Sequence, residues 1–295
     1  MERLGVRKDV VIGVIAGAGY GLVALGLVLI YKSSGVFNFA QGEFGTVAVF
    51  ALYLAHVNGV PYALALVVGL VAALVMGLLT ERLVVRPLFS APRVTLLVAT
   101  AGVALLAIGI ELWIGEAYLR QLAPALPRLD RVAAFGIRIS DQRLLILATL
   151  VVLAVLLGLF FSRTNLGLAV LAVSQEPVAT ELMGISVRRL SSFTWGLAAV
   201  LGGLGGMLTA PLVGGFGPGY LTFNALIPGF TAAVLGGMTS LPGAFVGGVV
   251  VGVAQSLAVS APVFAKIPGP GSVMVFVLLV TVLAVRPQGL LGKAA

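Results

Sequence analysis

The sequence lacks most of the residues from which active sites are built. It has no cysteine and a single histidine, His56, so it offers neither thiol chemistry nor a Cys/His metal site. One histidine, placed in an expected outer loop, does not make a Ser/His/Asp constellation. No phosphate-binding motif G-x-x-x-x-G-K-[ST] occurs, and Gly289–Lys293 has the wrong spacing. We therefore expect a protein that is not an enzyme and binds no cofactor or metal itself.

Charge is scarce as well. Only 9% of the residues are charged and 60% are hydrophobic, whereas a soluble domain has roughly a quarter of its residues charged. Such a chain cannot cover a surface that faces water, which predicts an integral membrane protein embedded in a lipid bilayer. The net charge of +8 is the basic loop signal of membrane topology and does not indicate a nucleic-acid partner.

The apolar runs predict an all-α, polytopic membrane protein that forms a single domain over residues 1–295. A spanning helix needs about 20 mostly apolar residues, and roughly eight or nine segments qualify. The first is too long for a signal peptide, so we expect it to be retained. The segments are Val10–Tyr31, Phe39–Ala55, Pro61–Thr80, Thr95–Ile114, Leu144–Phe161, Ser191–Val213, Ala225–Met238, Ala244–Ser260 and Ser272–Val285.

The loops at about 162–190 and 115–143 are predicted to lie on opposite sides of the membrane. Both carry several arginines, so the positive-inside rule hardly decides which one is cytoplasmic. The side of the N-terminus and the exact number of spans also stay open.

A polar turn interrupts the apolar sequence after the first segment. Asn38 and Gln41 are spaced as in a capping box, which predicts that a helix starts here, with Glu43 in its second turn. Helix starts at membrane depth offer N–H groups to a carboxylate. One interpretation is therefore a translocation path or substrate site; the other is a solvated cap at the bilayer surface. The candidate residues are Phe37, Asn38, Phe39, Gln41 and Glu43.

A second polar stretch, residues 174–185, hangs between two long apolar runs. It predicts a short helix that Gly184 ends. Leu182 and Met183 suit the groove of a soluble partner, and the alternative is an amphipathic helix resting on lipid, which the low Lys/Arg content disfavours. The candidate contact residues are Glu176, Ala179, Glu181, Leu182, Met183, Gly184 and Arg188.

Two more polar residues lie within apolar runs. Glu111 comes two residues before Trp113 near the end of a span, so we interpret it as interfacial. Gln255 is a lone polar residue, for which we expect a hydrogen bond between helices.

Several ordered motifs resemble the LivH-type membrane subunit of bacterial branched-chain amino-acid ABC importers. They include Asn38-Phe39-Ala40-Gln41-Gly42-Glu43, where the family has N-F-A-H-G-[DE], and they cover essentially the whole chain. Gln41 at the family's His position leaves any role for a histidine there in doubt. The other motifs are Leu22–Ala55 around it, Glu81-Arg82, Arg86-Pro87-Leu88, Ala91-Pro92-Arg93, Ala179–Ile185, Ala233–Gly237, Pro242-Gly243-Ala244 and Val285–Leu290.

The resemblance implies a type II ABC importer permease in the bacterial inner membrane. Its implied partners are a second homologous permease, two cytoplasmic ATPase subunits that bind ATP and magnesium, and a periplasmic or lipid-anchored binding protein. Residues 174–185 match the family's coupling helix, which is seated on an ATPase, so the loop at 162–190 is expected in the cytoplasm. Whether the two permeases are identical stays open.

Two alternatives remain at this stage. Urea and short-chain amide importers use similar permeases, so the substrate is less defined than the machine. A stand-alone secondary transporter or channel is the alternative from another class, and it would need more intramembrane ionisable groups than Glu43 and Glu111.

Overall fold

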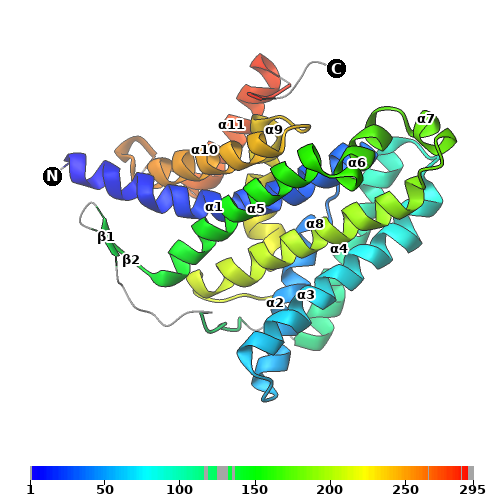
Figure 1. Ribbon diagram of the computed structural model, residues 1–295. Helices are drawn as coiled ribbons and strands as arrows, with labels where there is room; N and C mark the ends of the chain where they lie inside the picture. The colour runs from blue at the N-terminus through cyan, green and yellow to red at the C-terminus, as the bar shows by residue number, and fades with distance from the viewer. Residues whose placement is uncertain are drawn as a thin grey trace.

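The protein is a bundle of long helices (Figure 1). The computed structural model describes residues 2–115, 119–124, 132–134, 137–264, 266–286 and 288–291. The α-helices are α1 Glu2–Ser34, α2 Gln41–Val57, α3 Tyr62–Leu79, α4 Arg93–Gly115, α5 Asp141–Arg163, α6 Asn165–Gln175, α7 Pro177–Leu182, α8 Val187–Thr209, α9 Ile227–Gly236, α10 Leu241–Ser260 and α11 Pro270–Val285. The all-α class is confirmed.

Short irregular elements join the helices. Two are π-helical, η1 Thr80–Val85 and η4 Thr222–Leu226, and three are 3-10 turns, η2 Arg86–Leu88, η3 Ala210–Leu212 and η5 Pro262–Phe264. A small antiparallel hairpin, β1 Val132–Ala134 and β2 Ile137–Ile139, lies in the predicted loop 115–143. The rest of that loop is only partly within the described residues.

Six helices in the described residues are long and apolar enough to cross a membrane. The remaining predicted segments correspond to shorter helices, namely α2, the apolar stretch Thr222–Gly236 and α11. The six are Lys8–Ser34, Tyr62–Leu88, Arg93–Ile114, Asp141–Arg163, Val187–Leu212 and Leu241–Ser260. The chain is thus a multi-pass membrane protein whose spans differ in length.

Glycines allow the central helices to approach closely. A Cβ on Gly252 of α10 would overlap the backbone of Gly17 in α1. A Cβ on Gly206 of α8 would lie 2.6 Å from the carbonyl oxygen of Gly45 in α2. Small residues at such crossings are the usual basis of helix packing in lipid. The predicted interhelical role of Gln255 is also confirmed, because its Oε1 accepts a 2.6 Å hydrogen bond from the Tyr20 hydroxyl of α1.

The two candidate loops lie at opposite ends of the bundle. Figure 1 shows α7 at one end and the β1–β2 hairpin at the other. At the α7 end, Arg86 of η2 donates a 2.6 Å hydrogen bond to Ser192 in the first turns of α8. Helix α7 and the β1–β2 pair therefore lie at different ends of the bundle, and that the loops at 162–190 and 115–143 face different sides of the membrane stays a prediction.

Candidate functional site

The polar turn after α1 is buried inside the bundle. Gly35, with φ +66°, ends α1, and residues 36–40 lead into α2. The exposed fractions of Asn38, Gln41 and Glu43 are 1%, 0% and 0%. A solvated cap at the bilayer surface is inconsistent with this burial.

The predicted capping box is wrong. The residue that precedes α2 is Ala40, and no side chain caps the helix. Asn38 Oδ1 instead accepts a 3.0 Å hydrogen bond from the Ala40 N–H. Asparagine often closes such a local turn with the backbone two residues on, and this turn delays the helix until Gln41.

Hydrogen bonds attach the turn to two other helices. Gln41 Nε2 donates to the carbonyl oxygen of Ala198 in α8 at 2.9 Å, and Asn38 Nδ2 reaches Gln41 Oε1 at 3.5 Å. The Phe39 N–H donates to Thr100 Oγ1 of α4 at 3.2 Å. The turn is therefore a junction of α2, α4 and α8.

The two phenylalanines of the turn lie beside a third aromatic ring. Phe37 and Phe39 have centroid distances of 5.5 Å and 6.4 Å to Phe230 of α9. Both are only half-buried. They give the junction an apolar, partly accessible edge next to its buried amides.

Glu43 meets a second buried carboxyl, that of Glu111. Glu111 is 5% exposed, and its Oε2 accepts a 2.9 Å hydrogen bond from the Gly219 N–H. The interfacial interpretation of Glu111 is therefore wrong, although Trp113 is 85% exposed. Residues two apart point to roughly opposite sides of an α-helix, so Trp113 faces outward while Glu111 faces α2.

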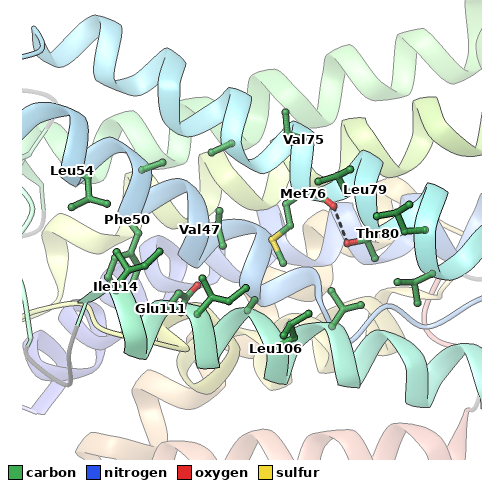
Figure 2. A pocket seen from close by; sticks show the side chains of 17 residues that line it. Val47, Phe50, Leu54, Val75, Met76, Leu79, Thr80, Leu106, Glu111 and Ile114 are labelled. Atoms are coloured by element: carbon green, nitrogen blue, oxygen red, sulfur yellow. Dashed lines mark hydrogen bonds between the residues drawn. The ribbon is translucent and has the colours of Figure 1, made fainter.

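An apolar cavity of about 570 Å³ lies between α2, α3, η1 and α4 (Figure 2). Its polar lining residues are Thr80, whose hydroxyl donates to the Met76 carbonyl at 2.8 Å, and Glu111. Glu111 lies toward the end marked by Leu54 and Ile114, away from Thr80. The carboxyl pair is thus bordered by an apolar cavity.

The second polar stretch, residues 174–185, covers the last residues of α6 and all of α7, and an apolar ridge of Leu182 and Met183 at the end of α7 faces outward. Leu182 and Met183 are 84% and 82% exposed. Gly184, with φ +81°, follows them and ends the helix as predicted. Glu176, Ala179 and Glu181 are exposed too. Such a ridge has no internal partner, so it is available to another molecule.

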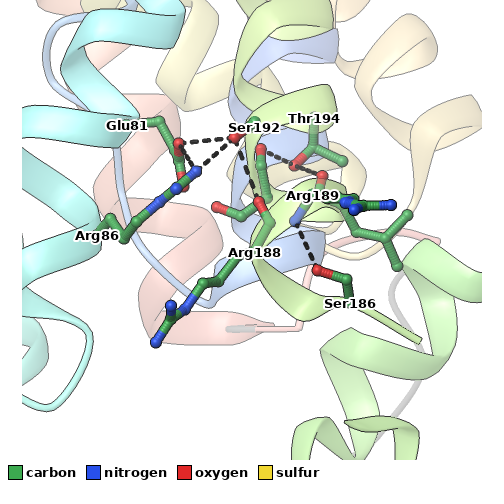
Figure 3. Close-up of polar contacts among 9 residues, drawn as sticks. Glu81, Arg86, Ser186, Arg188, Arg189, Ser192 and Thr194 are labelled. Atoms are coloured by element: carbon green, nitrogen blue, oxygen red, sulfur yellow. Dashed lines mark hydrogen bonds and ion pairs between the residues drawn. The ribbon is translucent and has the colours of Figure 1, made fainter. Parts of the chain in front are cut away.

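An ion pair between Arg86 and the buried carboxylate of Glu81 lies beside the first turns of α8 (Figure 3). Arg86 contacts both carboxylate oxygens of Glu81, at 3.1 Å and 2.7 Å, and Ser192 Oγ donates to Glu81 Oε2 at 2.9 Å. The same hydroxyl contacts the carbonyl oxygen of exposed Arg188 at 3.2 Å. The cluster joins η1 to the start of α8. In the sequence, Glu81 and Arg86 occur only as parts of motifs, and no local pattern indicates that Ser192 lies beside them.

Within the described residues, no three His, Cys, Asp or Glu side chains gather as a metal site would require. The described residues offer a polar junction of α2, α4 and α8 inside the bundle and an exposed apolar ridge at one end.

The comparisons with known proteins agree with the motifs. The family model of the branched-chain amino acid transport system permease component matches residues 10–285. The chain is 31% identical to the high-affinity branched-chain amino acid permease BraD of Pseudomonas aeruginosa, over 97% of this chain and 95% of that protein. It is also 31% identical to LivH of Escherichia coli K12, over 95% and 94%.

A third relative and a solved structure extend the comparison. The probable permease LivH of Methanocaldococcus jannaschii is 30% identical over 92% of this chain and 88% of that protein. A chain of PsaBC from Streptococcus pneumoniae in complex with Fab superposes with a TM-score of 0.51 at 14% identity, covering 94% and 91% of the two chains, which supports the fold. The resemblance read from the motifs is confirmed, and the chain belongs to the branched-chain amino acid transport permease family.

Proposed function

We propose that this protein is the permease subunit of an ATP-driven importer for branched-chain amino acids in a bacterial inner membrane. The observation that carries the proposal is family membership over residues 10–285, with relatives named for this transport along nearly the whole chain. The permease forms the translocation path, and ATP with magnesium acts on partner subunits.

The α7 ridge is the contact for an ATPase. Leu182 and Met183 enter an apolar groove of that subunit, while Glu176, Glu181 and Arg188 lie at its rim. Support comes from their exposure at one end of the bundle. Exposed apolar anchors surrounded by polar residues are the pattern of a protein interface.

The turn at residues 36–43 lines or braces the translocation path. Buried amides beside half-buried aromatic rings suit a substrate with a polar head and an apolar side chain. The turn also joins α2, α4 and α8, so a movement of α8 that begins at α7 reaches it through Gln41 and Ala198. In the importer, a second permease completes the path and a binding protein delivers the substrate.

Import into proteoliposomes tests the proposal. The vesicles contain this chain, a second permease and two ATPases, with binding protein outside and ATP inside. We expect labelled leucine, isoleucine or valine to accumulate, and no accumulation with a hydrolysis-deficient ATPase. Accumulation of urea or acetamide instead would overturn the substrate. Uptake by this chain alone, driven by an ion gradient, would overturn the proposed class.

A further inference from the structure

If Glu43 and Glu111 were both ionised, the described residues would leave their two negative charges without compensation. Glu43 is fully buried and Glu111 nearly so. Three of their four oxygens, both of Glu43 and Oε1 of Glu111, have no hydrogen-bond partner among the described residues. Ionised carboxylates only accept hydrogen bonds, so two of them in contact cannot satisfy each other.

No described cation compensates the pair. Arg86 binds Glu81. Arg120, which comes after α4, lies over the rings of Phe50 and Tyr53, 5.7 Å from each centroid. The polar groups beside the two carboxyls are each other, the Gly219 N–H, and the hydroxyls of Thr46 and Thr222, and neither hydroxyl is in hydrogen-bonding geometry with a Glu43 oxygen. Two negative charges in contact in an apolar interior are strongly unfavourable without a counter-charge.

Water from the neighbouring cavity does not offer a remedy. Apart from Glu111 and Thr80, the walls of that cavity are apolar. Thr80 already donates its hydroxyl proton to Met76. A buried water needs two to four polar partners, and this side supplies too few.

We propose that Glu43 and Glu111 form a proton-binding site, in which one proton is shared between the two carboxyl groups. The protonated group donates a hydrogen bond to the ionised one, and the remaining charge is stabilised by the Gly219 N–H. The proton belongs to the pair and not to either residue. This site goes beyond the transport function and does not depend on which substrate is carried.

The proton joins three separate parts of the chain. Glu43 belongs to the first turn of α2, Glu111 to the last turns of α4, and Gly219 to the segment before η4. The same contact includes Thr46, whose hydroxyl accepts a 3.1 Å hydrogen bond from the Leu221 N–H. A Cβ on Gly42 would overlap Thr222, so α2 and η4 are pressed together here. The site therefore links the start of α2 to the last turns of α4 and to the segment before η4.

Infrared difference spectroscopy of the full chain in lipid nanodiscs tests the proposal. The spectrum of the wild type minus that of Glu43→Gln/Glu111→Gln at pH 7 should contain one protonated-carboxyl band, sensitive to D2O, and one carboxylate band per chain. The matched control is Glu81→Gln, a buried glutamate beside Arg86, whose difference spectrum should contain one carboxylate band only and calibrates the intensity.

Two carboxylate bands and no protonated band would overturn the proposal and would indicate a bound cation. Two protonated bands and no carboxylate would overturn it as well. If the double variant does not fold, the wild type alone answers the question. Its protonated band should be present at pH 7 and convert to one carboxylate on alkaline titration, and its absence at pH 7 would contradict the shared proton. None of these outcomes bears on the imported substrate.

Discussion

The turn at residues 36–43 and helix α7 are both polar interruptions of an apolar chain, yet their environments are opposite. In the turn, Asn38, Gln41 and Glu43 are buried, and Gln41 is hydrogen-bonded to α8. In α7, Leu182 and Met183 are apolar and almost fully exposed. Both places therefore reverse the usual pattern, because polar side chains lie inside at the turn and apolar side chains lie outside at α7. Such inversions are the features that stability alone does not explain.

The largest expected effect comes from changing the α7 ridge. Leu182→Asp/Met183→Asp places two charges where the ATPase groove is expected to be apolar. We expect a loss of about 2–4 kcal/mol in association, which is roughly 30- to 1,000-fold in affinity. Co-purification of the ATPase with the permease, and the affinity of the ATPase for immobilised permease, measure this loss.

The permease itself should not be affected by this double change, because both side chains are exposed. Its thermal unfolding in detergent is the control. Undiminished co-purification of the ATPase would remove the ridge from the interface, whereas loss of the folded permease would show that α7 is structural.

The buried region should respond in the opposite way. Asn38→Ala removes the acceptor of the Ala40 N–H, and a buried donor left unpaired costs about 1–3 kcal/mol. We expect lower thermal stability and weaker transport with ATPase binding unchanged. Glu181→Ala, on the exposed surface, is the matched control and should stay within about 0.5 kcal/mol. Equal stability of the two variants would show that the burial of Asn38 has no energetic consequence.

Close helix packing gives a third contrast, of about 1–3 kcal/mol. Gly206→Ala brings a methyl group against the Gly45 carbonyl and should destabilise the contact of α8 with α2. Gly158→Ala in α5 meets nothing within 4 Å, and the better helix propensity of alanine leaves it neutral or stabilising. Thermal unfolding of both variants measures the difference. A neutral Gly206→Ala would argue against the tight α2–α8 crossing.

The smallest effect is expected at the ion pair of Arg86 and Glu81. Arg86→Lys keeps the charge beside Glu81 but loses the two-pronged contact. We expect a loss of about 0.5–1.5 kcal/mol in stability and a modest drop in substrate-stimulated ATP hydrolysis by the reconstituted complex. Arg188→Lys, on the surface, should change neither quantity. A drop in ATP hydrolysis with Arg188→Lys alone would place the important cation at the rim.

The sequence predicted the exposed region better than the buried one. The end of α7 at Gly184 follows from local chemistry, since glycine adopts positive φ at low cost. The start of α2 does not follow from local chemistry. The Asn38 side chain can either cap the helix or close a turn with Ala40, and the local sequence does not decide between the two. The pairing of Glu43 with Glu111 joins residues 68 positions apart, and no local pattern encodes it.

Cysteine cross-linking is the sharpest test of whether the α7 ridge contacts the ATPase, because the chain has no native cysteine. Leu182→Cys and Val263→Cys replace side chains that are both 84% exposed, one at the end of α7 and one in η5. In the detergent-solubilised importer, we predict that Leu182→Cys cross-links to the ATPase and reacts with added thiol reagents less than it does in the permease alone, while Val263→Cys does not cross-link. Cross-linking of Val263→Cys to the ATPase, or full accessibility of Leu182→Cys in the complex, would contradict the account.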